Sequence, residues 1–221
     1  MNLKNQFEQL CSAFTEDRQL INSLWNEIET RYSEKSRYYH NLLHLENMFR
    51  ELDDVKGNIS GFTAISFSVF YHDIIYDATS KSNEEKSAAA AEKRLTELHV
   101  NKDDISVISE QIIATKSHQL SVHNDTNYLL DADLSVLGKD FKTYMEYTRN
   151  IRKEYSVYPD FLYKPGRKKS LNIFLNLKVS LKQNILRKSM RLRQKRILKP
   201  SSGYCNCKMQ DPVLHKTKTS Q

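Results

Sequence analysis

The chain has 221 residues, of which 39% are hydrophobic, and its cysteines are Cys11, Cys205 and Cys207. This length suffices for one globular domain with an ordinary core, and three unevenly spaced cysteines exclude a disulfide framework. No apolar run reaches the roughly 18–20 residues that span a bilayer, and the N-terminus MNLKNQFEQL carries charges where a signal peptide would be apolar. We therefore expect a cytoplasmic protein that is neither exported nor bound to a membrane.

The net charge of +7 conceals two regions of opposite charge. Residues 161–221 contain 16 Lys or Arg and one acid, Asp211, whereas residues 1–160 contain 18 bases and 26 acids. A basic surface can bind nucleic acid through the phosphate groups. Because the body of the chain is acidic, such binding would have to come from the tail alone.

Apolar residues at three- and four-residue spacings predict amphipathic helices over residues 3–14, 17–32 and 36–51. On the third of these helices, His40 and His44 are four residues apart and would share one face. Two histidines on one face suit a metal ion. The alternative is that one histidine is a ligand and the other supports it or faces a substrate.

The segment FTAISFSVFYHDIIYD, residues 62–77, predicts a buried central helix that carries His72 and Asp73 among apolar side chains. Burying an imidazole and an ionised carboxylate costs several kcal/mol unless they are paired or bind a metal. Two interpretations are therefore open: an internally hydrogen-bonded His–Asp pair, or two ligands of a metal site.

Two further helices are expected over residues 83–99 and 103–117. Ser82 and Glu85 have the spacing of a capping box at the start of the first, which leaves the neighbouring Glu84 without a role in the cap. The second helix delivers Lys116 and His118 to its C-terminal end, where a simple explanation is that they complement the helix dipole.

The segment YLLDADLSVLG sets Asp131 and Asp133 in an apolar context, so we expect one of the two carboxylates to face inward. The sequence has few glycines and prolines and no alternating apolar–polar pattern of strand length, so we do not expect β structure. The predicted fold class is all-α.

Six ordered blocks of the sequence resemble a bacterial subgroup of the HD superfamily of metal-dependent phosphohydrolases. The blocks are RYYHNLLHLENMF, FYHDIIYD, NEEKSA, IIATKSH, LLDADLSVLG and IRKEY. The HD dipeptide alone is a weak signal, but six blocks in order over about residues 5–175 make a specific match. The resemblance implies an HD-domain-like helical bundle over residues 1–175 and metal-dependent hydrolysis of a phosphate ester, a class that includes nucleotides.

The H…HD…D signature of that superfamily also implies a ligand set. The residues that match it are His44, His72, Asp73 and Asp131, with Asp133 as the rival for the fourth place. Two neutral imidazoles and two carboxylates can hold one divalent ion and leave positions open for water and a phosphate oxygen. These ligand types do not distinguish Mn, Mg, Fe, Co, Ni and Zn.

A phosphate ester also requires cations and proton-transfer groups beside the metal. The candidates for substrate binding are Arg37, Lys116, Arg149, Arg152 and Lys153. The candidates for catalysis are Arg37, His40, Glu84 and His118. For each of these residues a solvated surface position is the alternative. The expected partner is a small phosphorylated substrate, and a homo-oligomer is compatible with the sequence.

Residues 176–221 depart from the resemblance, since they are almost purely basic with irregular apolar spacing. We expect a disordered tail rather than a domain. Back-translation of residues 177–199 with suitable codons, followed by a shift of two nucleotides, gives KSIFKTEYFKKKYEAKAEKNIK, which resembles the C-terminal helix of the relatives. We therefore interpret the tail as the product of a frameshift, which the encoding DNA would test.

Three functions compete on this evidence: a metal-dependent phosphohydrolase, a catalytically inactive HD-fold binding protein, and a nucleic-acid-binding protein that works through the basic tail. The presence of all four ligand types favours the enzyme over the inactive protein. The frameshift interpretation removes most of the reason for nucleic-acid binding.

Overall fold

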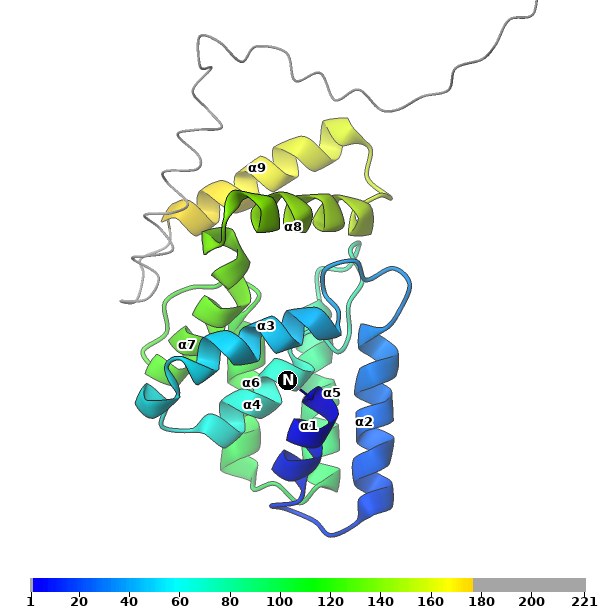
Figure 1. Cartoon of the computed structure of the whole chain (residues 1–221), viewed down its shortest axis with the longest axis vertical. Coiled ribbons are helices and arrows are strands. Elements are labelled where there is room, and N and C mark those ends of the chain that lie inside the picture. Colours follow the sequence, from blue (N-terminus) through cyan, green and yellow to red (C-terminus); the bar gives the residue numbers. More distant parts are fainter. Residues whose placement is uncertain (1, 177–221) are drawn as a thin grey trace, which may run out of the picture.

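The computed structural model describes residues 2–176, and every regular element in that range is a helix, so the predicted all-α class is confirmed (Figure 1). The α-helices are α1 (Leu3–Cys11), α2 (Arg18–Tyr32), α3 (Leu42–Asp53), α4 (Phe62–Tyr71), α5 (Asn83–Glu97), α6 (Lys102–Ala114), α7 (Asn124–Asp133), α8 (Phe141–Glu154) and α9 (Asp160–Asn176). Two 3₁₀ turns are η1 (Lys56–Asn58) and η2 (Leu134–Gly138). None of these helices is long and apolar enough to cross a membrane. Apart from its first residue, the predicted basic tail lies outside the described residues, and so does the frameshift interpretation.

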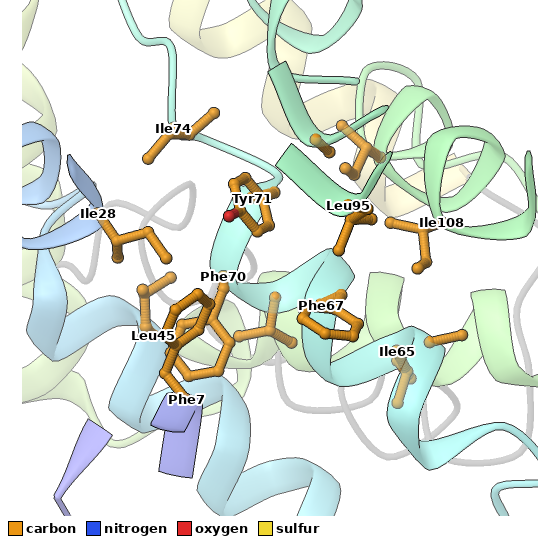
Figure 2. Packing of buried hydrophobic residues seen from close by; sticks show 14 of the residues in the cluster. Phe7, Ile28, Leu45, Ile65, Phe67, Phe70, Tyr71, Ile74, Leu95 and Ile108 are labelled. Atoms are coloured by element: carbon orange, nitrogen blue, oxygen red, sulfur yellow. The ribbon is translucent and has the colours of Figure 1, made fainter. Parts of the chain in front are cut away.

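The centre of the core is α4, in which every residue from Ala64 to Tyr71 is buried. A helix that is apolar all round must be covered on all sides, and α3, α5, α6 and α7 pack against it. The Phe70 ring, for example, lies 5.0 Å from the rings of both Phe7 and Phe49. Figure 2 shows the Phe7 and Phe70 rings among the other apolar side chains of this cluster.

The helix predicted over residues 36–51 begins only at Leu42. The Asn41 side chain accepts a backbone hydrogen bond from the first turn and caps the helix there. His40 therefore precedes the helix, and the prediction that His40 and His44 share one helix face is wrong.

The helix predicted over residues 62–77 ends one residue before His72, which is its C-terminal cap. The backbone that follows is held by a distant side chain. The Arg37 guanidinium donates hydrogen bonds to the carbonyl oxygens of Asp73, at 2.5 Å, and Ile74, at 3.1 Å. These bonds give the two carbonyl groups the hydrogen-bond partners that a longer helix would have supplied.

The capping box predicted at the start of α5 is absent. The Ser82 side chain makes no capping hydrogen bond, and its hydroxyl lies 3.3 Å from that of Ser80. Glu85 instead forms an ion pair with Lys116, which follows α6. The attraction of a full positive charge from another element has displaced the local bond.

A second, smaller hydrophobic cluster lies at one end of the molecule. It is centred on Leu137, Tyr147 and Ile151, and Tyr163 of α9 packs against it. Figure 1 shows α8 and α9 together at this end. The boundary between the two clusters is where the polar residues of the candidate site lie.

Candidate metal centre

Three helices bring two histidines and a carboxylate together. His44 lies in the first turn of α3, His72 is the cap that ends α4, and Asp133 is the last residue of α7. The two histidine Nε2 atoms are 3.3 Å apart, and His44 Nε2 is 3.1 Å from Asp133 Oδ1. One ligand atom from each residue lies within 4.8 Å of the other two, so the group could hold a metal ion.

Asp73 adds a second carboxylate beside this group. Its Oδ2 is 3.1 Å from His72 Nε2, and its side chain is 14% exposed where that of His72 is 1% exposed. A hydrogen-bonded pair and two neighbouring ligands both fit this contact. The second histidine and Asp133 at the same place distinguish the site from an isolated pair.

The spacing of these atoms fits a shared ion. Two nitrogen ligands that each lie ~2.1 Å from one ion are separated by roughly 3.0–3.4 Å at bond angles between about 90° and 109°. The observed separations of 3.3, 3.1 and 3.1 Å fall in this range. The ligand types, imidazole and carboxylate, suit a first-row transition metal and leave the choice among the divalent ions open.

The protonation of the cluster also fits a cation. His72 Nδ1 donates to the Val69 carbonyl oxygen at 3.0 Å, so in the neutral ring the Nε2 lone pair faces the cluster. Burial lowers the pKa of His72, but the charge and hydrogen bond of Asp73 together with the Asp133 charge outweigh burial and raise that pKa to about 9. Burial lowers the pKa of His44 despite its contact with Asp133. Burial raises the pKa of both carboxyl groups, yet the surrounding histidines bring each pKa below its ordinary value.

The structure brings Asp133, rather than Asp131, to the histidines. Asp131 is buried, with 3% of its surface exposed, but the cluster formed by the described residues does not include it. Two residues along a helix turn the side chain by roughly 200°, so only one of the pair can face α3 and α4. The geometry therefore favours the residue that the sequence ranked second.

His118 extends the cluster through Asp133. Its Nε2 donates to Asp133 Oδ2 at 2.8 Å, while Asp133 Oδ1 faces His44. His118 follows α6 with a φ of 51°, in the left-handed region that few non-glycine residues adopt. This backbone conformation directs the ring to the cluster, so His118 does more than complement a helix dipole.

His40 and Glu154 form a second polar pair at the edge of the site. His40 Nδ1 lies 2.6 Å from Glu154 Oε2, and Tyr76 donates its hydroxyl to the same oxygen at 2.9 Å. Glu154 Oε1 accepts the backbone N–H groups of Tyr39, at 2.6 Å, and of His40, at 3.0 Å. Sequence reasoning missed Glu154. The signal was present, because Glu154 continues the buried face of α8 three residues after Ile151.

The predicted substrate-binding cations lie elsewhere. The Arg37 side chain is fully buried and engaged with backbone carbonyls, and Lys116 pairs with Glu85. Arg152 binds Asp160 and two carbonyl oxygens at the α8–α9 turn, and the Lys153 ammonium lies 5.1 Å from the Tyr38 ring. None of these residues lines the pocket beside the cluster, and neither do the exposed Arg149 and the half-buried Glu84.

That pocket has a volume of about 410 Å³ and lies against the cluster. His40, His118 and Asp133 line one side of it. Tyrosines and apolar residues of α8, α9 and their neighbours line the rest, together with Arg167. A volume of this order holds a small organic ligand. Such a ligand would reach the metal-competent group at Asp133.

The chain was compared with protein-family models, with curated proteins and with solved structures, and none of the three comparisons gave a match.

Proposed function

We propose that the protein is a metal-dependent phosphohydrolase of the HD type, which uses one divalent ion to hydrolyse a small phosphate ester. The observation that carries the proposal is the convergence of His44, His72 and Asp133 at ligand spacing, with Asp73 in contact with His72 and a pocket beside Asp133. The six sequence blocks that resemble this superfamily contain His44, His72, Asp73 and Asp133, although the resemblance itself ranks Asp131 ahead of Asp133 as the fourth ligand.

The proposed roles divide between the ion and the protein. A divalent ion in this site would supply Lewis-acid chemistry, since it lowers the pKa of a coordinated water and offsets negative charge on phosphorus. His44, His72, Asp73 and Asp133 would hold it. His118 fixes the orientation of Asp133 through the hydrogen bond to Oδ2.

His40 is the candidate proton donor to the leaving oxygen. It lines the pocket, and its Nδ1 is held by Glu154, so the other ring nitrogen is available to a ligand. Burial lowers the pKa of His40, but the hydrogen bond to Glu154 and the nearby carboxylates outweigh it and raise that pKa above its ordinary value. A protonated imidazole near neutral pH is the state that general-acid catalysis needs.

The test combines metal analysis with an activity panel on the purified full-length chain. We expect about one ion per chain and metal-dependent phosphate release from at least one ester among mononucleotides, cyclic nucleotides, sugar phosphates and polyphosphate. His72→Ala should lose the ion and at least 100-fold of the activity. His123→Ala, which changes an exposed histidine, should lose neither. Stoichiometric metal without hydrolysis of any ester would favour the inactive binding protein, and a chain that binds no metal would overturn the proposal.

A further inference from the structure

Asp73 lies outside any helix, so the helix geometry does not fix where its carboxylate points. The helix α4 ends at Tyr71 and His72 caps it, which leaves Asp73 in the turn that follows. Side chains on turns are placed less precisely than side chains on helices unless other groups hold the turn. Because the Asp73 carboxylate must meet His72 Nε2, 3.1 Å away, the groups that hold this turn also control the site.

Two side chains from outside α4 hold the Asp73 backbone. The Tyr32 hydroxyl, at the end of α2, accepts the Asp73 N–H at 3.2 Å. The Arg37 guanidinium donates to the carbonyl oxygen of the same residue. Both backbone polar groups of Asp73 are therefore bound by side chains that come from an earlier part of the chain. The direction of the Cα–Cβ bond of Asp73 follows from these two bonds.

Both partners are buried and have little freedom to move. Tyr32 is 1% exposed, and the Arg37 side chain is fully buried. The guanidinium carbon lies 5.1 Å from the centre of the Tyr32 ring and 5.5 Å from the centre of the Tyr76 ring. Arg37 Nε also donates to Glu34 Oε2 at 3.2 Å. A planar cation with these contacts holds its N–H donors in fixed directions.

The Tyr71 hydroxyl provides a contrast with that of Tyr32. Tyr71 is equally buried, with 1% of its surface exposed, but its hydroxyl has no hydrogen-bond partner among the described residues. Both rings contribute to the hydrophobic core. Of these two tyrosines, Tyr32 is the one whose hydroxyl binds the backbone of a proposed metal ligand. The pair therefore separates the effect of a buried hydroxyl from the effect of this particular hydrogen bond.

We propose that Tyr32 is a positioning residue for metal binding: together with Arg37, it holds the Asp73 peptide so that the carboxylate faces His72. This inference rests on the proposed function, because it takes Asp73 as a ligand. Removal of the Tyr32 hydroxyl leaves the Asp73 N–H without this partner and allows the turn to relax. Groups that orient a metal ligand typically change metal affinity by about 10–100-fold when they are removed.

The test is binding of Co²⁺ to the metal-free full-length chain, measured by calorimetry and by the visible absorption of the bound ion. The absorption bands of Co²⁺ depend on the number and arrangement of its ligands. We expect Tyr32→Phe to weaken Co²⁺ binding about tenfold or more and to change these bands. Tyr71→Phe, the matched control, removes an equally buried hydroxyl and should keep the wild-type affinity and absorption.

A second variant tests the other half of the arrangement. Arg37→Lys keeps the positive charge but loses the planar group that reaches two carbonyl oxygens. It should change Co²⁺ affinity and absorption in the same direction as Tyr32→Phe. Arg50→Lys makes the same change at an exposed position of α3 and should bind like the wild type. Urea unfolding of each metal-free variant measures its stability separately.

The outcomes separate this inference from the proposed function. If Tyr32→Phe and Arg37→Lys lowered only the stability and kept the wild-type Co²⁺ affinity and absorption, the inference would be overturned even if the chain hydrolyses a phosphate ester. Equal effects of Tyr32→Phe and Tyr71→Phe would also overturn it. Weaker binding with changed absorption in Tyr32→Phe alone of these two would support it even if no ester is hydrolysed. A wild-type chain that binds no Co²⁺ would overturn both.

Discussion

Replacing Glu154 by Gln should destabilise the protein strongly, although it changes only one atom. The Glu154 side chain is fully buried and accepts four hydrogen bonds, two from His40 and one each from Tyr39 and Tyr76. An amide keeps one acceptor oxygen and turns its own N–H groups toward donors. Breaking a buried charged pair by removing one partner costs about 3–5 kcal/mol, and each kcal/mol lowers the melting temperature by roughly 2–4 °C for a domain of this size. We expect the melting temperature to fall by roughly 6–20 °C.

The pH dependence of this loss is a sharper test. Burial raises the pKa of Glu154, but the hydrogen bonds from His40 and Tyr39 together with the His40 charge outweigh burial and lower that pKa in the folded state. This stabilisation is therefore present above the ordinary glutamate pKa of 4.5 and is lost as pH falls through the folded value. The pKa of His40 is raised, so its stabilisation is complete below the ordinary histidine pKa of 6.5 and is lost as pH rises through the folded value. The difference between wild type and Glu154→Gln should therefore be largest between about pH 4.5 and 6.5.

Urea unfolding followed by circular dichroism in EDTA, from pH 4 to 9, would measure this difference without a contribution from bound metal. Glu146→Gln, an exposed position on the same helix, is the matched control and should change the free energy of unfolding by less than ~0.5 kcal/mol. A Glu154→Gln loss that is below ~1 kcal/mol, or that does not vary with pH, would refute the reasoning.

Three further predictions concern the metal group and its support. His72→Ala and Asp73→Ala should each lose the ion, as measured by elemental analysis. Each variant should also lose the stabilisation that the bound ion gives by mass action, which is about 2.7 kcal/mol when free metal is at 100 times its Kd. A variant that keeps full metal content would remove that residue from the ligand set. Asp133→Asn should lose the ion while Asp131→Asn keeps it and loses about 1–3 kcal/mol of stability as a buried polar change; equal metal loss from both would show that the cluster geometry is wrong. Arg37→Gln should lower the free energy of unfolding, measured in urea, by about 3 kcal/mol or more, because several buried hydrogen bonds are broken. It should leave KM unchanged if the residue acts through the backbone, and a selective rise in KM would contradict this.

The sequence predicted the elements that depend on apolar pattern. The apolar run of α4 is buried as expected, and His72 and Asp73, which directly follow the helix, are in contact. Periodicity shows which residues share a face inside a helix, but it does not show where the helix ends. Asn41 caps the start of α3, so the helix does not include His40, and α4 ends just before His72 and Asp73. Each boundary depends on a single side chain or on a side chain that is distant in the sequence. A pattern of apolar residues does not reveal such contacts.

The sequence could not decide between Asp131 and Asp133 for a related reason. Both carboxylates are on α7, and the apolar neighbours of each are similar in sequence. Which of them meets the histidines depends on how α7 is rotated against α3, and that rotation is set by packing rather than by local sequence. Glu154 was missed because its partner, His40, is far away along the chain.

The position of the site between two hydrophobic clusters explains why its polar groups are tolerated and what they connect. The ligand group joins α3, α4 and α7, whose apolar faces belong to the main cluster, whereas Tyr147 of α8 and Tyr163 of α9 belong to the smaller cluster. A bound ion would therefore stabilise the main body, while a ligand in the pocket would touch the smaller cluster together with His118 and Asp133 at the edge of the metal group. Since a ligand that binds only the folded arrangement stabilises whatever it contacts, occupancy of the pocket should protect the amide hydrogens of α8 and α9 against exchange more than metal alone does. Equal protection by metal alone would mean that α8 and α9 are already held without a ligand.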